Sequence, residues 1–467
     1  MKAKRLAASG PIEGPWTLPG GWRWERLGDL VERCPEKVLP SAGGDLPFVG
    51  MDSIPSGEMR VTQTVPFASL RSAGNKFRPA DVLYGRLRPY LNKVWRADRH
   101  GACSGELLVL RAGHELDSDY LAYALHAHHF VHYASHAVTG DRPRLDFAVM
   151  AEFPLPVPPL EVQRRIVARI DELFAEIDDG EAALARARED LTTWRKALLK
   201  AAVTGELTAE WRRTISAGES GAQLIGRLLE QRTQRWTADH RNAGKRYAQP
   251  TQPDLFGTPA LPEGWTWASI EQLTTGGIRN GLSLKETASP SPVKGLRLDA
   301  LQGDQVDWSR FRFLPIELED ARPYLLRRGD LLISRANGSQ HLVGRCTLVD
   351  RDTDDTIFPD TAIRYPLVGD ARLQAWATIV WSAPQTRARL LKRAKTTAGI
   401  LKVSQADIAS VPLPIPPTSE IDLIVALVQG QLAEAEAGAD DLQHLEPTPA
   451  KLRQSILSAA FRGELTA

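Results

Sequence analysis

The clearest hydrophobic pattern along the chain is a seven-residue repeat between residues 160 and 202. This region follows Pro158-Pro159 and contains no further proline. Apolar side chains at every seventh position, with a second series three residues later, are typical of a helix that packs along another helix. The pattern predicts a helix about 40 residues and about 60 Å long. Its first apolar series is Ile170, Ile177, Leu184, Leu191 and Leu198.

A thinner version of this pattern recurs 258 residues later. Pro447 and Pro449 are expected to interrupt it, with Thr448 as the N-cap where the helix restarts. Matching apolar faces predict that the two long segments form an antiparallel, coiled-coil-like pair. The alternative is two separate amphipathic helices, each packed on its own domain. The predicted core positions of the second segment are Val428, Leu442, Leu445, Leu452 and Ile456.

The remainder of the chain also contains an internal sequence repeat. A repeat of this length predicts two structural units with the same fold. The offset is 243 residues at the start of each copy, 249 in a weaker central pair and 258 at the end. The repeated pairs are LPGGWRWERLGDLVE (18–32) with LPEGWTWASIEQLTT (261–275), RPADVLYGRLRPYL (78–91) with RRGDLLISRANGSQ (327–340), FPLPVPP (153–159) with VPLPIPP (411–417), and KALLKAAVTGELT (196–208) with QSILSAAFRGELT (454–466).

Each copy begins with a body in which short apolar runs alternate with turn residues, followed by a helical stretch at 118–137 or 370–384. Such runs predict strands. The fold class is therefore α+β: two globular α/β domains separated by two long antiparallel helices, with a pseudo-two-fold internal repeat. The expected divisions are a tail (1–17), the first body (18–152), a central helical region (153–208), a connector (209–260), the second body (261–410) and a C-terminal helical region (411–467).

Composition narrows the class of protein. Of 467 residues, 43% are hydrophobic and 25% are charged, which is ordinary for a soluble globular protein. A transmembrane helix is not expected because no run of about 18 apolar residues occurs, and the first residues lack the apolar stretch of a signal peptide. The three cysteines suit a reducing cytoplasm. A net charge of +1 argues against a general electrostatic nucleic-acid binder.

Motifs for self-contained catalysis are missing. The sequence has no GxGxxG or GxxxxGK[ST] loop, no GxSxG and no HExxH. We therefore expect no catalytic residues, no cofactor and no metal. A histidine cluster leaves three alternatives open: a solvated face, which is favoured, a DNA-facing surface, and a metal site. Its members are His126, His128, His129, His132 and His136.

Two loops that follow predicted strands carry the candidate DNA contacts. Arginine, asparagine and glutamine make bidentate contacts with bases, and serine and lysine hold phosphates. The structural alternative is a simple hairpin turn at Asn337-Gly338 with solvated arginines. Three more cations, close to Gly140 and Gly399, are candidates for backbone contact or ordinary surface charge. The loop candidates are Arg86, Arg88, Asn92, Lys93, Arg335, Asn337, Ser339 and Gln340, and the three cations are Arg142, Arg144 and Lys402.

These features together resemble the specificity subunit of type I restriction-modification enzymes over nearly the full length. The resemblance rests on the paired LPxGWxW starts, the DVLYGRLRPYLNK and GDLLISRANGS loops, the PLPxPP entries to long helices and the AAxxGELT ends. It implies a non-catalytic subunit whose two target recognition domains each read half of a split site in double-stranded DNA. It further implies helices that set the spacing and dock two methyltransferase subunits, to which restriction and translocase subunits add.

The chain departs from that family at the start of each long helix. The family often has Glu-Gln after the PLPxPP segment, whereas this chain has Val162-Gln163 in the first copy and Glu420-Ile421 in the second. Neither copy keeps both residues, which bears on how methyltransferase subunits would dock.

Two alternatives to this function remain. The chain could be a coiled-coil scaffold that binds only proteins, or a self-contained DNA-modifying enzyme, although the missing motifs speak against the latter. Separately, the sequence QPDLF at 252–256 is similar to the short peptide that docks on bacterial sliding clamps. The simpler alternative for this segment is a linker anchored by a buried Leu-Phe pair.

Overall fold

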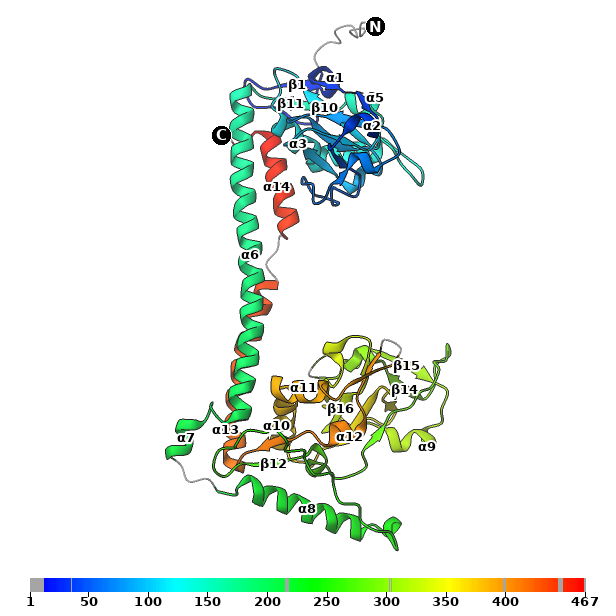
Figure 1. The fold of residues 1–467 in the computed structure, drawn as a ribbon, viewed down its shortest axis with the longest axis vertical. Helices are drawn as coiled ribbons and strands as arrows, with labels where there is room; N and C mark the ends of the chain where they lie inside the picture. The colour runs from blue at the N-terminus through cyan, green and yellow to red at the C-terminus, as the bar shows by residue number, and fades with distance from the viewer. Residues whose placement is uncertain are drawn as a thin grey trace. The chain divides into compact units, whose positions relative to one another are not determined.

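One helix of 45 residues, α6 (Leu160–Thr204), runs through both structural units of the chain (Figure 1). The first unit comprises Met1–Arg186 and Leu445–Ala467, and the second comprises Ala187–His444. The first part of α6 therefore belongs to the first unit and its last turns belong to the second. The computed structural model describes residues 12–34, 36–214, 218–301, 303, 305–397, 400–443 and 448–465.

The first unit is built on a four-stranded antiparallel sheet in the order β2-β10-β7-β8. All four residues of β7 are buried, as are the first four of β10, because these strands carry the continuous apolar runs VLYG and LLVL. The sheet packs against two helices, α3 and α4. The bounds are β2 Val31–Arg33, β7 Val82–Gly85, β8 Val94–Arg96, β10 Leu107–Ala112, α3 Ser118–His126 and α4 His128–His136.

A second, five-stranded sheet in the first unit has the order β3-β6-β9-β4-β5. A separate two-stranded ladder, β1 with β11, joins the LPxGW start of the body to the PLPxPP segment before α6. The bounds are β1 Arg23–Arg26, α1 Leu27–Leu30, β3 Lys37–Val38, α2 Pro40–Gly43, β4 Pro47–Val49, β5 Val65–Pro66, β6 Gly74–Phe77, β9 Gly101–Cys103, α5 Phe147–Ala151, β11 Pro154–Val157 and α14 Pro449–Arg462.

The second unit repeats this plan. Its four-stranded sheet has the order β13-β20-β16-β18, which matches the first sheet strand for strand. Two helices, α10 and α11, follow as α3 and α4 do, and the ladder of β12 with β23 matches β1 with β11. The bounds are β12 Thr266–Ala268, β13 Arg279–Asn280, β16 Asp330–Ser334, β18 Cys346–Leu348, β20 Ala362–Pro366, α10 Ala371–Ser382, α11 Pro384–Leu391 and β23 Leu413–Ile415.

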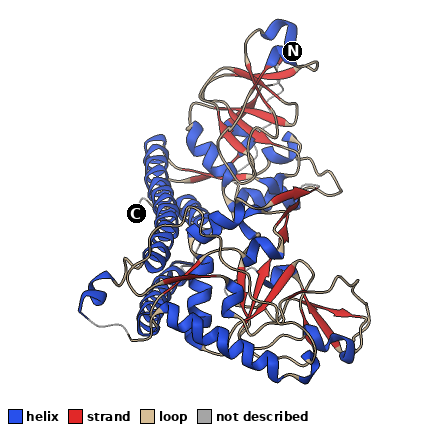
Figure 2. Ribbon diagram, turned by 60° about the horizontal axis from the view of Figure 1, so that its bottom comes forward, coloured by secondary structure: helices blue, strands red, loops and turns tan. Residues whose placement is uncertain are grey.

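Figure 2 marks the helices of the molecule in blue and its strands in red. The smaller sheets of the second unit differ from those of the first. They are three-stranded, in the orders β15-β14-β19 and β17-β22-β21. The connector forms two helices, α7 and α8. The remaining bounds are α7 Ala209–Thr214, α8 Gly221–Ala238, β14 Val293–Leu296, β15 Phe311–Leu314, α9 Leu318–Ala321, β17 Ala336–Asn337, β19 Thr356–Ile357, β21 Lys395–Thr397, β22 Ile400–Lys402, α12 Gln405–Ala409 and α13 Thr418–Gln443.

The turn before the central strand shows the repeat at single-residue level. Asp81 accepts the backbone N–H of Arg78 at 3.0 Å, and Asp330 accepts that of Arg327 at 2.9 Å. The residue before each aspartate has positive φ, +70° at Ala80 and +87° at Gly329. Glycine adopts this conformation freely and alanine does not, so the first copy stores backbone strain that the second avoids.

The long helices pair antiparallel, as predicted. In the first unit, α14 lies beside α6 and runs the opposite way (Figure 1), and Arg453 forms ion pairs with Asp178 and, at 2.6 Å, with Glu181. In the second unit, Arg195 of α6 pairs with Glu436 of α13 at 3.8 Å. Arg195 and Arg453 are 258 positions apart, as are Asp178 and Glu436. The same ion pair is therefore made in both units.

The predicted helix-core positions differ in burial. Ile170, Leu198 and Val428 are buried. Leu452 is 36% exposed, whereas Leu457 is fully buried. The interruption explains this shift, because α13 ends at Gln443 and α14 restarts at Pro449 with Thr448 at its N-cap, so the heptad phase is not maintained. Leu445 lies outside the described residues, as does the side chain of Leu442, and the positions that are partly buried are Ile177, Leu184, Leu191 and Ile456.

The end of each long tail docks on the start of a body. Gly205 and Gly463, 258 positions apart in the two GELT segments, both have positive φ. A Cβ placed on Gly205 would lie 2.8 Å from Pro262, and one on Gly463 would lie 2.4 Å from Pro19. These prolines belong to the repeated LPxGW segments, so the requirement for glycine is the same in both units.

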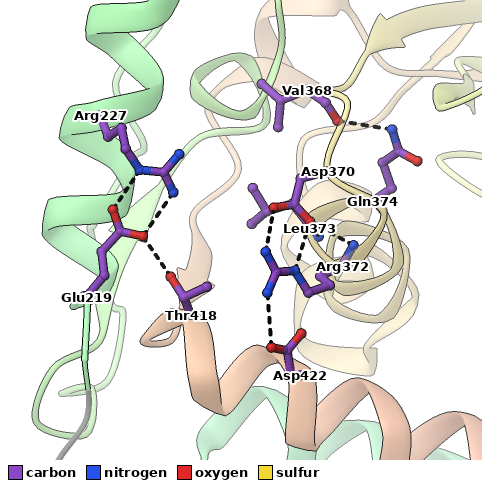
Figure 3. A network of polar contacts seen from close by, with 9 residues as sticks. All are labelled: Glu219, Arg227, Val368, Asp370, Arg372, Leu373, Gln374, Thr418 and Asp422. Atoms are coloured by element: carbon purple, nitrogen blue, oxygen red, sulfur yellow. Dashed lines mark hydrogen bonds and ion pairs between the residues drawn. The ribbon is translucent and has the colours of Figure 1, made fainter.

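The first turn of α13 is tied to its surroundings by a polar network (Figure 3). Thr418 donates a hydrogen bond to Glu219 at 2.8 Å, and Glu219 also receives two hydrogen bonds from Arg227. The hydrogen bonds from Arg227 lower the pKa of Glu219. One turn later, Asp422 pairs with Arg372 at 3.1 Å. The connector helix α8 and the body helix α10 therefore both hold the base of α13.

Two predicted elements have different bounds. The helix predicted over 118–137 is divided at Ala127, which has extended backbone and separates α3 from α4. The turn suggested at Asn337-Gly338 is not a hairpin between neighbouring strands, because β17 pairs with the distant β22.

Candidate nucleic-acid interface

In the first unit, the loop after β7 is joined to a segment far along the chain. We call residues 86–93 the first arginine loop and residues 142–145 the first return segment. Arg88 N–H donates to the carbonyl of Pro143 at 2.8 Å, and Leu145 N–H donates to that of Arg86 at 2.9 Å. These bonds bring together Arg86, Arg88, Arg142 and Arg144, which the sequence predicted as two separate groups.

The second unit makes the same connection. Residues 335–340 form the second arginine loop, and residues 400–403 form the second return segment. Val403 N–H donates to the carbonyl of Arg335 at 2.9 Å, and β17 pairs with β22 so that Ala336 faces Lys402 and Asn337 faces Leu401. Arg335, Asn337 and Lys402 therefore lie together. The offsets from Arg86 to Arg335 and from Arg144 to Lys402 are 249 and 258, those of the sequence repeat.

The electrostatic environment of the two loops differs. In the first unit, Arg86 forms an ion pair with Asp146, and Arg144 binds Glu106 at 3.0 Å. Hydrogen bonds to Asp146 and Glu106 thus already occupy two of the predicted DNA-binding cations. Among the described residues of the second unit, Arg335 and Lys402 have no such carboxylate pair. Their charge is available to an external anion without an exchange of partners.

A hollow of about 350 Å³ opens at the second arginine loop. The hydroxyl of Thr361 is buried there with no hydrogen-bond partner among the described residues. Asp360 is exposed at its edge. A ligand in this hollow would meet donors, an acceptor and a rotatable hydroxyl, the groups that read base edges. The residues of the predicted interface that line it are Arg335, Asn337 and Lys402, and the added ones are Asp360 and Thr361.

Sequence reasoning missed these partners for definable reasons. Asp146 is two positions from Arg144 in DRPRLD, but its ion-pair partner is Arg86, which lies 60 positions earlier in the chain, so local sequence does not reveal the pair. Glu106 reaches the arginine loop only because β10 lies beside β7, and Thr361 reaches Arg335 only because β20 lies beside β16. Those contacts require the sheet order, which a single sequence does not provide.

Several predicted contact residues are used for structure. Asn92 donates to the carbonyl of His126 at 2.9 Å, and Lys93 donates to that of Met51 at 2.6 Å. Both side chains hold the loop to the body. Asn337 accepts the backbone N–H of Ser339 at 2.9 Å, which shapes the second loop. Ser339 and Gln340 are themselves exposed.

Arg88 is the most unusual residue of the first loop. It is exposed, and its φ of +53° places a non-glycine residue in the left-handed region. Such strain persists where the surrounding structure fixes it, and it is concentrated at functional sites. Neither Arg88 nor the exposed Arg142 has a side-chain partner among the described residues. They are the two unpaired cations of the first loop and its return segment.

The histidine cluster separates into different environments. His126 is 7% exposed at the end of α3, and burial lowers its pKa to about 4. On α4, the rings of His132 and His136 are stacked with centroids 4.0 Å apart. Within the described ranges, no group of three or more His, Cys, Asp or Glu side chains is arranged to hold a metal ion. No helix in those ranges is long and apolar enough to cross a membrane.

The fold and the paired loops define a class of protein when compared with known families. Residues 19–184 match the family model described as the type I restriction modification DNA specificity domain. That match covers the first body, its return segment and the first part of α6.

Relatives extend the match. The chain is 30% identical over 314 residues to the EcoKI specificity subunit of Escherichia coli K12, covering 67% of this chain and 58% of that protein. It is 21% identical over 518 aligned residues to the EcoEI specificity subunit of Escherichia coli, and this alignment covers 98% of this chain and 86% of that protein. The first of these alignments thus spans less than two thirds of its relative. The family match and these relatives together indicate a specificity subunit of the type I restriction-modification family.

Solved structures agree on the fold. A chain from a study of complex assembly and conformational transition of the type I R-M system has a TM-score of 0.67 and 19% identity, and the alignment covers 96% of this chain and 100% of that chain. The HsdS subunit from Thermoanaerobacter tengcongensis has a TM-score of 0.57 and 21% identity, with 97% and 99% covered. The doubled architecture of α/β domains and long helices predicted from the sequence is therefore confirmed.

Proposed function

We propose that this chain is the non-catalytic, DNA-reading subunit of a cytoplasmic restriction-modification complex, and that each arginine loop reads one half of a bipartite site in double-stranded DNA. The observation that carries the proposal is the repeated connection of each loop to its return segment. Backbone hydrogen bonds fix the loop in both units. Among the residues that the structure describes, Arg88 and Arg142 in the first unit and Arg335 and Lys402 in the second have no carboxylate partner. A loop whose backbone is already fixed loses less conformational entropy on binding.

The long helices suit the role of a spacer. Helices rise 1.5 Å per residue and are stiff, so two readers attached to one helix pair would fit only half-sites with the correct gap. The low net charge of the chain is compatible with this role if partner subunits supply further contacts with DNA. We propose that these partners are two methyltransferase subunits docked on the helical regions, with restriction and translocase subunits added through them.

The test is reconstitution with and without the methyltransferase subunits, followed by sequencing of methylated positions. We expect methylation at a two-part motif, and only when this chain and the methyltransferase subunits are both present. Methyl transfer by the purified chain alone would instead support a self-contained enzyme. Methylation or DNA protection with no dependence on sequence would support a protein-binding scaffold. Either result would overturn the proposal.

A further inference from the structure

The connector between the two bodies displays an exposed apolar pair. Phe256 is 90% exposed and Leu255 is 49% exposed. Phe256 exceeds every other exposed large hydrophobic residue in the described ranges, of which the next is Leu39 at 58%. The simpler interpretation of QPDLF, a buried Leu-Phe anchor for the linker, is therefore wrong. Phe256 is almost fully accessible to solvent, and Leu255 is accessible over about half of its surface.

The backbone beneath the pair is fixed. Arg389 donates to the carbonyl of Phe256 at 3.0 Å and to that of Gly257, and Asp254 N–H donates to the carbonyl of Ser410 at 2.8 Å. Arg393 forms an ion pair with Asp254. The turn closes with Thr258 N–H donating to the carbonyl of Leu255 at 3.1 Å. Asp254 and the backbone carbonyls of Phe256 and Gly257 are thus bonded to the body, while the Phe256 side chain is exposed to solvent.

We propose that residues 252–256 are a preformed docking peptide for a second protein, and that this protein is a bacterial sliding clamp. The chemistry of recognition is an apolar pocket that takes two adjacent hydrophobic side chains beside a hydrogen-bonding rim. Leu255 and Phe256 supply the anchors. Gln252 is exposed three positions before Leu255 and supplies an amide for the rim. The spacing of these three residues is the feature shared with clamp-docking peptides.

The arrangement keeps the conformational entropy cost of binding low. Docking an unstructured peptide requires its backbone to be ordered, whereas this segment is already held by Arg389 and Arg393. Binding through Gln252, Leu255 and Phe256 leaves those contacts intact, because the three side chains are exposed and none of them takes part in the contacts. The inference is independent of how the arginine loops read DNA.

The test is a titration of the full-length chain, in its complex with the methyltransferase subunits, with a fluorescently labelled bacterial sliding clamp. We expect binding by the wild type and a loss of affinity of about tenfold or more in the Leu255→Ala/Phe256→Ala variant, since buried aromatic anchors dominate interfaces. The matched control is Leu318→Ala, which removes another exposed leucine of the second unit, 43% exposed, and should bind like the wild type.

A second variant tests the preformed turn. Arg389→Ala should weaken binding while keeping both anchors, because the segment must then be ordered on docking. No binding by the wild type, equal binding by the double variant, or unchanged affinity in Arg389→Ala would each contradict the proposal. Site-specific methylation should persist in the double variant, so loss of clamp binding is distinguishable from failure of DNA reading.

Discussion

The two bodies share a sheet order and a loop connection, yet they present their cations differently. In the first unit, Arg86 and Arg144 are held by Asp146 and Glu106, and among the described residues of the second Arg335 and Lys402 have no equivalent carboxylates. The backbone design is thus kept while the electrostatics vary. A framework that fixes a loop through main-chain hydrogen bonds leaves its side chains free to change. Such a design suits the proposed role of reading DNA, in which the target depends on the side chains of the loop.

The two units also differ in the buried polar residue near the start of each long helix. Glu420 is fully buried in the second unit and accepts hydrogen bonds from Thr208 at 2.6 Å and Trp265 at 2.8 Å, and it pairs with Arg212. In the first unit, Gln163 is the buried polar residue, bonded to the backbone of Glu115, Asp117 and Pro158. Each copy keeps one member of the family's Glu-Gln pair and gives it a complete set of partners.

The largest effect is expected from Glu420→Ala, which leaves Arg212 without its buried partner. Breaking a buried ion pair costs about 3–5 kcal/mol, so the second unit should lose that much unfolding free energy. Gln163→Ala is the matched change in the first unit and should cost about 1–3 kcal/mol, because it leaves buried backbone groups without hydrogen bonds. Hydrogen–deuterium exchange measures each unit separately. Equal losses in both units after either change would contradict this distinction.

The next largest effect concerns base reading by the second loop. Arg335→Ala with Asn337→Ala should relax specificity at one half-site and leave the other intact. The expected cost is about 1–3 kcal/mol for each bidentate hydrogen-bonded pair that the substitutions remove. Methylation of a library with each half-site randomised measures this. Equal relaxation at both halves would refute independent reading by the two bodies.

The first unit should lose stability in mild acid because it buries His126, whereas the second unit has no histidine at the matching position. His126 ends α3 just before an extended alanine, where Ser382 ends α10. Burial lowers the pKa of His126 to about 4, so the unfolded chain binds more protons between pH 6.5 and 4. The contribution of neutral His126 to the unfolding free energy of the first unit is fully present above pH 6.5. About 2 kcal/mol of that free energy is lost when the pH falls to 5. Hydrogen exchange of wild type and His126→Gln between pH 7 and 5 checks this. An identical pH dependence in the two proteins would contradict it.

The smallest effect is expected from Glu106→Gln, which frees Arg144 without changing the loop backbone. DNA affinity should rise by up to about fivefold, the range of an exposed ion pair, and the salt dependence should become steeper. The matched control is Glu36→Gln, which removes an exposed carboxylate of the same unit that pairs with Lys76 outside the loop, and it should leave DNA affinity nearly unchanged. A fall in affinity for Glu106→Gln would mean that the carboxylate itself contacts DNA.

Much of the architecture could be predicted from the sequence, because repeats and heptads are local patterns. The helices, the central strands and the break before Pro449 all follow from periodicity and proline chemistry. The carboxylates beside the arginines, the hollow at Thr361 and the burial of Leu457 in place of Leu452 could not be predicted. They depend on which strands lie side by side in the sheets and on which face α14 buries after it restarts at Pro449. The spacing of residues in one sequence gives neither.

The most direct test of two readers on one spacer is to lengthen the spacer. One heptad inserted in α6 after Arg186, with a matching heptad between α13 and α14, adds about 10 Å, close to the rise of three base pairs. Sequencing the sites methylated by the reconstituted complex should show unchanged half-sites separated by about three more base pairs. An unchanged gap with full activity would contradict the account.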